Sequence, residues 1–225
     1  MIRAALFDAA GTLIELAEPV GETYARHAER QGLAISAWRL TDAFGRACQQ
    51  TPLPVSPATD APERREVERE WWRDVVRRTF LAADSERRPP DFDALFAGLW
   101  DTYSNARQWR TRAGALALLD RLRERGLRTA VVSNFDSRLG GLLADLGFDG
   151  RLDAIVLASD VGAAKPAPEI FHFALERLHV APHEAIFVGD DPERDLAAAE
   201  AAGLVAIDAT ALATLTDLRL PEGTA

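Results

Sequence analysis

Four apolar runs in the sequence each lead into polar residues that can do chemistry. In chain order, these polar residues are Asp8, then Ser133 and Asn134, then Lys165, and finally Asp190 and Asp191. Carboxylates can act as nucleophiles or bind a hard cation, whereas hydroxyl, amide and ammonium groups can bind an anion's oxygens. If these groups meet in one place, they form a candidate site for catalysis or binding.

Each of these residues also has an ordinary structural interpretation. Asp before a Gly-Thr turn, Ser-Asn after a strand and Gly-Asp-Asp are all frequent in turns and helix caps. What favours chemistry is that all four sets follow predicted strands in order. In open α/β sheets, ligands bind beyond the carboxyl ends of the strands, so these residues should share one edge.

The lysine content of the chain also points to this edge. Lys165 is the only lysine among 26 basic side chains, so every other one is arginine. Lysine is a compact point charge that can contact one oxygen in a crowded pocket, whereas arginine presents a wide planar fork. A functional position for Lys165 is therefore favoured over chance retention on the surface, which stays the alternative.

The elements that must position these residues are strands alternating with helices. Five nearly continuous apolar runs read as strands buried on both faces: Arg3–Phe7, Arg128–Val132, Ala154–Ala158, Ala185–Val188 and Leu204–Ile207. Four helical patterns separate them: Gly114–Arg125, Arg138–Leu146, Pro168–Leu178 and Arg194–Ala202. This alternation predicts an α/β fold, with a doubly wound parallel sheet and helices on both faces.

A helical insertion is expected between the first strand and the rest of the sheet. All five tryptophans lie between residues 38 and 109, and the aromatic residues there are expected to form a core of their own. The predicted helices of this stretch are Val20–Arg30, Trp38–Gln49, Glu63–Phe80 and Phe92–Tyr103. We therefore expect a core of residues 1–15 and 110–225, with residues 16–109 inserted.

Composition narrows the class of protein. The 225 residues carry a net charge of −9, which argues against a nucleic-acid backbone as the main partner. The apolar runs are too short to span a bilayer, and the one cysteine excludes an internal disulfide. We expect a cytoplasmic protein with a small-molecule partner, and the oligomeric state is not readable from the sequence.

The ordered set of motifs resembles the haloacid dehalogenase-like hydrolase superfamily. Phe7–Leu13, Ser133–Asn134, Lys165–Pro166 and Gly189–Asp195 are similar to its four motifs in turn. The resemblance is to the branch with an all-α helical cap inserted after the first motif. It implies a Rossmann-like core and hydrolase activity.

This resemblance, together with charge, assigns roles to the residues. Asp8 would be a nucleophile that forms an aspartyl-phosphate. Asp8, the backbone carbonyl of Ala10 and Asp190 would hold Mg²⁺, the expected cofactor. Either Asp191 or Asp195 would orient Lys165 or a water molecule on the metal.

The phosphoryl oxygens need partners of their own. Four residues are expected to bind the substrate: Thr12, Ser133, Asn134 and Lys165. Backbone N–H groups of the Ala9–Gly11 turn would join them.

One position departs from the pattern of the family's phosphatases. These usually have a second Asp two residues after the nucleophile, where it serves as general acid and base, but this chain has Ala10. Three interpretations stay open: the protein hydrolyses phosphate compounds whose leaving group needs little protonation or borrows an acid from the cap or the substrate, it catalyses a different reaction, or it binds without turnover.

Two family alternatives are weakened by other residues. Phosphonoacetaldehyde hydrolases need a lysine in the cap, and this insertion has none. Dehalogenases of the family need no metal and do not keep the acidic pattern seen at 190, 191 and 195. We therefore expect a Mg²⁺-dependent phosphatase acting on a small phosphorylated metabolite. A binding protein with little or no activity is the main alternative, followed by a metal-independent 2-haloacid dehalogenase.

Overall fold

The computed structural model describes residues 1–55 and 60–221, which divide into two compact units. The first unit comprises residues 1–15, 55 and 110–221, and the second comprises residues 16–54 and 60–109. Each unit has a hydrophobic core of its own. Within the described residues, no helix combines the length and the hydropathy that crossing a bilayer requires.

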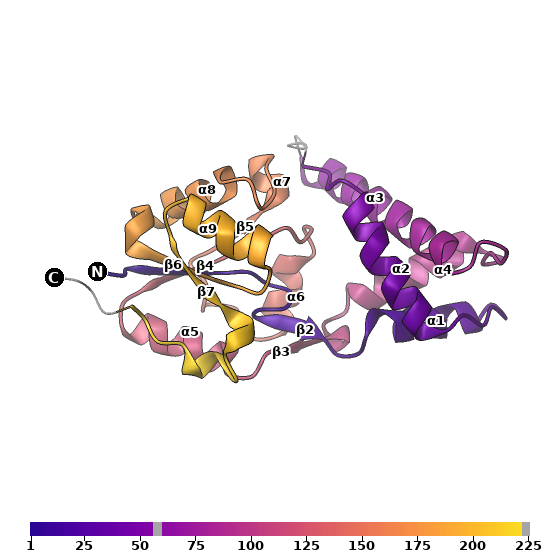
Figure 1. Ribbon diagram of the computed structural model, residues 1–225, viewed down its shortest axis with the longest axis horizontal. Coiled ribbons are helices and arrows are strands. Elements are labelled where there is room, and N and C mark those ends of the chain that lie inside the picture. The colour runs from indigo at the N-terminus through magenta and orange to yellow at the C-terminus, as the bar shows by residue number, and fades with distance from the viewer. Residues whose placement is uncertain (56–59, 222–225) are drawn as a thin grey trace. The chain divides into compact units, whose positions relative to one another are not determined.

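A five-stranded parallel sheet forms the centre of the first unit (Figure 1). The strands lie side by side in the order β5 (Ala154–Leu157), β4 (Arg128–Ser133), β1 (Ala4–Phe7), β6 (Ala185–Gly189) and β7 (Val205–Asp208). After β1, the chain adds β4 and β5 on one side of β1 and then β6 and β7 on the other side. The order therefore reverses between β1 and β6, where doubly wound sheets open a crevice for ligands.

Helices cover both faces of this sheet, as Figure 1 shows. The helices of the first unit are α5 (Ala115–Glu124), α6 (Leu139–Asp145), α7 (Ala158–Val161), α8 (Glu169–Leu178) and α9 (Ala198–Ala201). Alternate strand residues such as Leu6, Val132 and Phe187 pack against α8 and α9 in one buried cluster. The four residues of β1 are fully buried, as a central parallel strand requires.

The predicted fold class is confirmed, and the five strands begin and end within one residue of the predicted positions. The single helix predicted over Arg194–Ala202 is wrong: the structure has a wide π-helical turn, Pro192–Ala197, followed by the short α9. The turn widens because the N–H groups of both Asp195 and Leu196 donate to the carbonyl of Asp191.

Two short strands were not predicted. β2 (Ile14–Leu16) and β3 (Trp109–Thr111) pair as a separate two-stranded sheet. Each has only three residues, which is too few to show a period in the sequence.

The second unit contains α1 (Val20–Glu29), α2 (Ala37–Gln50), α3 (Ala61–Ala83) and α4 (Phe92–Tyr103), close to the predicted bounds. Its core includes Tyr24, Phe80 and Phe96, and the Tyr24 and Phe80 rings stack 5.8 Å apart. The expected aromatic core is therefore present, but it excludes Trp38, which is 71% exposed at the start of α2.

The contact between α8 and the sheet should carry much of the first unit's stability. Phe171 is fully buried, and its ring meets that of Phe187 edge-on at 5.1 Å. We expect Phe171→Ala to lower the free energy of unfolding by about 3–5 kcal/mol in urea titrations, because it leaves a cavity. Phe173→Ala on the same helix is the control: Phe173 is only partly buried, so an equal loss there would contradict the account.

Candidate active site

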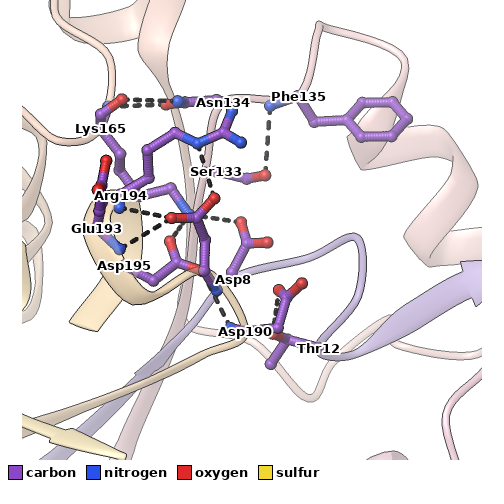
Figure 2. A network of polar contacts seen from close by, with 11 residues as sticks. Asp8, Thr12, Ser133, Asn134, Phe135, Lys165, Asp190, Glu193, Arg194 and Asp195 are labelled. Atoms are coloured by element: carbon purple, nitrogen blue, oxygen red, sulfur yellow. Dashed lines mark hydrogen bonds and ion pairs between the residues drawn. The ribbon is translucent and has the colours of Figure 1, made fainter. Parts of the chain in front are cut away.

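Asp8 lies where the strand order reverses. It directly follows β1, and its N–H donates to the carbonyl of Val188 in β6, 2.9 Å away. Asp190 directly follows β6, so the pairing of these two strands brings the two carboxylates to the same edge (Figure 2). Asp8 is buried, whereas Asp190 is half-buried.

Lys165 joins this pair from the loop before α8. Its Nζ donates to Asp8 Oδ1 at 2.7 Å and to Asp195 Oδ1 at 2.5 Å. The side chain is buried, and burial alone would lower its pKa. The two carboxylates outweigh that effect and raise the pKa of Lys165, so the ammonium stays charged.

Asp195 is held in place by the widened turn that follows β6. Its Oδ2 accepts hydrogen bonds from the N–H groups of Asp190 and Asp191, at 3.1 and 3.3 Å. A Cβ on Gly189 would lie 2.5 Å from the Cβ of Asp195, so only glycine lets this carboxylate approach the end of the strand.

Three acidic side chains thus converge beside a single ammonium. Carboxylate oxygens of Asp8, Asp190 and Asp195 all lie within 4.8 Å of one another. Burial and the nearby charge of Asp8 raise the pKa of Asp190, because both disfavour its charged form. Carboxylate oxygens are the ligands that Mg²⁺ prefers, and a divalent cation would neutralise the excess charge, so the donor set fits this metal.

Thr12 and Gly11 fix the orientation of Asp190. Thr12 is fully buried, and its hydroxyl donates to Asp190 Oδ1 at 3.1 Å. Gly11 has a φ of +95°, and a Cβ there would lie 2.4 Å from Asp190 Oδ2. The hydroxyl of Thr12, predicted to bind substrate, is thus used to hold a carboxylate of the acidic cluster.

Ser133 is the last residue of β4, one position longer than the predicted strand, and Asn134 follows it; their side chains do different things. The Ser133 hydroxyl accepts a hydrogen bond from the N–H of Phe135 at 3.3 Å, which leaves its proton available to a ligand. The Asn134 amide donates to the carbonyl of Lys165 at 2.9 Å and accepts from its N–H at 2.8 Å. In this structure Asn134 therefore holds the backbone of Lys165.

Asp191 and Asp195 make different contacts, so the structure distinguishes their roles. The Asp191 side chain accepts from the N–H groups of Glu193 and Arg194 and pairs with the Arg194 guanidinium at 2.9 Å. Burial would raise the pKa of Asp191, but these bonds outweigh it and lower the pKa. Asp191 thus caps the turn, and Asp195 is the one that contacts Lys165.

The turn after Asp8 is closed by its own backbone. The N–H groups of Leu13 and Ile14 donate to the carbonyl of Ala9, and that of Gly11 donates to the carbonyl of Ile14 at 2.8 Å. The Gly11 N–H, expected to help bind an anion, is therefore already used. Ala10 is half-buried and brings a methyl group to the position of the usual acid.

Known proteins resemble this chain in sequence and in fold. Residues 2–203 match the family model described as haloacid dehalogenase-like hydrolase. The mouse (Mus musculus) haloacid dehalogenase-like hydrolase domain-containing protein 3 is 36% identical over 90% of this chain and 80% of its own length.

Two solved structures share the fold at low sequence identity. A HAD phosphatase from Thermococcus onnurineus has a TM-score of 0.61 and 22% identity, covering 92% of this chain and 86% of its own. The L-2-haloacid dehalogenase from Xanthobacter autotrophicus has a TM-score of 0.68 and 21% identity, covering 92% and 77%. The family match, the relative and the fold lead to one conclusion: this chain belongs to the haloacid dehalogenase-like hydrolases.

Proposed function

We propose that this hydrolase is a Mg²⁺-dependent phosphatase that acts on a small phosphorylated metabolite through an aspartyl-phosphate on Asp8. The observation that carries the proposal is the cluster of Asp8, Asp190 and Asp195 around the ammonium of Lys165. Three carboxylates against one ammonium leave an excess of negative charge, which would repel an anionic substrate. Bound Mg²⁺ supplies the positive charge that a phosphoryl group needs next to a carboxylate.

The chain's own residues account for the covalent steps. One Asp8 oxygen accepts from Lys165, so the other can attack phosphorus, and the bond to the leaving oxygen breaks with its electron pair. Water then attacks the same phosphorus, which releases phosphate and restores the carboxylate of Asp8. Lys165 and the Ser133 hydroxyl stabilise the charge on the phosphoryl oxygens during both steps.

Ala10 limits which leaving groups the proposed phosphatase can release quickly. A methyl group cannot protonate the leaving oxygen, so compounds with acidic leaving groups should react fastest. Aryl phosphates and acyl phosphates belong to this class.

Two other functions make different demands on the site. A binding protein without turnover is supported by Ala10. A 2-haloacid dehalogenase would use the Asp8 carboxylate to displace halide from carbon, a step that needs no cation. The close approach of Asp190 and Asp195 to Asp8 favours a cation at the site, which the dehalogenase does not need. Turnover itself separates the phosphatase from the binding protein.

Hydrolysis of p-nitrophenyl phosphate and acetyl phosphate tests the proposal, because neither substrate needs an acid at position 10. We expect turnover that requires Mg²⁺, stops with chelator and falls by at least about 10³-fold in Asp8→Asn, since the nucleophile is lost. Release of halide from 2-chloropropionate, measured in parallel with chelator present, would instead favour the dehalogenase. No turnover of any of these compounds would leave the binding protein.

Restoring an acid at position 10 tests what its absence costs. We expect Ala10→Asp to raise kcat/KM for alkyl phosphates by up to about 10²–10⁴-fold and to change acetyl phosphate hydrolysis little. Ala10→Asn is the matched control, since it has the same shape but no acid. An equal response of both substrate classes, or an equal gain in Ala10→Asn, would contradict this role.

The raised pKa of Asp190 predicts a trade between stability and metal binding. A folded-state pKa above the unfolded value means that stability present at low pH is lost as the pH rises through that pKa. Asp190→Asn should therefore raise Tm at neutral pH without metal, by about 2–4 °C for each kcal/mol of relieved repulsion.

Asp190→Asn should also weaken Mg²⁺ binding by about 100-fold or more. Loss of a residue that only supports a metal ligand typically costs less, about 10–100-fold. Because the metal needs the deprotonated carboxylate, wild-type affinity should fall as the pH is lowered through the raised pKa of Asp190. Calorimetric titration measures both effects, and Asp191→Asn is the control because Asp191 caps a turn. A lower Tm in Asp190→Asn with unchanged Mg²⁺ affinity would refute the prediction.

A further inference from the structure

Arg112 holds the turn that carries the nucleophile, although it touches none of the acidic side chains of the cluster in the contacts described. It lies between β3 and α5, half-buried, in the first unit. Its N–H donates to the carbonyl of Leu13 at 2.9 Å. Its guanidinium donates to the carbonyl of Gly11 at 3.4 Å.

The same guanidinium reaches a second turn. It donates to the carbonyl of Ala209 at 2.6 Å and to that of Leu212 at 3.1 Å. Ala209 follows β7 directly and is fully buried. Arg112 therefore joins the turn after β1 to the turn after β7.

In the sheet, β6 lies between β1 and β7, and Asp190 directly follows β6. The arginine thus ties together the turns on either side of the strand that delivers Asp190. A change in the position of Gly11 would act directly on Asp190, because the α-carbon of Gly11 faces its carboxylate with no room for a Cβ. Thr12, next to Gly11, holds the same carboxylate by a hydrogen bond.

We propose that Arg112 is a positioning residue for the cation site: it fixes Gly11 and Thr12 against Asp190, and so sets the distance between the carboxylates of Asp190 and Asp8. The inference rests on the proposed function, since it concerns the same cation. Arginine suits the task because its planar group carries five N–H donors and can serve three carbonyls at once. Lysine, with a compact ammonium, cannot span them.

The chain offers a matched control in Arg121 on α5. Its guanidinium also donates to two backbone carbonyls near the C-terminus, those of Thr216 at 2.8 Å and Leu218 at 3.0 Å. Arg112→Met and Arg121→Met therefore remove the same kind of anchor. Only the first removes an anchor of the turn after Asp8.

The experiment is titration of the full-length protein with Mn²⁺, a paramagnetic substitute for Mg²⁺, followed by electron paramagnetic resonance, with Tm measured on the same samples. We expect Arg112→Met to weaken Mn²⁺ binding by about 10–100-fold, the usual effect of losing an outer partner of a metal site. Arg121→Met should stay within about two-fold of wild type, although its Tm also falls. Arg112→Lys should be weakened as well, and it replaces Arg112→Met if that variant does not fold.

Three results would overturn the role of Arg112 while leaving the proposed function intact. They are wild-type affinity in Arg112→Met, full rescue by Arg112→Lys, and equal weakening in Arg121→Met. Failure of the wild-type protein to bind Mn²⁺ or Mg²⁺ is a different outcome, because it refutes the proposed function itself and the positioning role with it.

Discussion

A buried ammonium between two carboxylates is the interaction on which the rest of this site depends. Lys165 can remain charged inside the protein only because Asp8 and Asp195 accept hydrogen bonds from its ammonium, at 2.7 and 2.5 Å. The Asn134 amide fixes the backbone of Lys165, and the wide turn after β6 delivers Asp195. Removal of Lys165 would leave two buried carboxylates without their cation, and removal of either carboxylate would leave the ammonium with one of its two acceptors, so the three groups form a single unit.

The sheet makes this unit possible because its parallel strands end together. β1 and β6 are hydrogen-bonded neighbours at the point where the strand order reverses, so Asp8 and Asp190 meet without a long loop. Their closeness has a cost that appears in the raised pKa of Asp190, caused by burial and by Asp8. In the proposed function, the same crowding that disfavours the cation-free protein prepares the site for a cation, a common trade between stability and function.

Much of this was predictable from the sequence, and what was not has physical reasons. Buried strands are continuous apolar runs, so their carboxyl ends, and with them Asp8, Lys165 and Asp190, could be placed at one edge. The choice between Asp191 and Asp195 was not readable, because it depends on a π-helical turn that shifts the register of side chains. The bonds from Asn134 and Arg112 go to backbone carbonyls, which are the same for every residue and leave no pattern in the sequence.

In the proposed function, Asp8 accepts a phosphoryl group only when a divalent cation is present. Acid quenching of the protein after incubation with acetyl phosphate, followed by peptide mass spectrometry, tests it most directly because acyl phosphates survive at low pH. We expect one phosphoryl group on the peptide that contains Asp8 with Mg²⁺, and none with chelator. A phosphoryl group on another residue, equal labelling with chelator, or no labelling in either condition would contradict it.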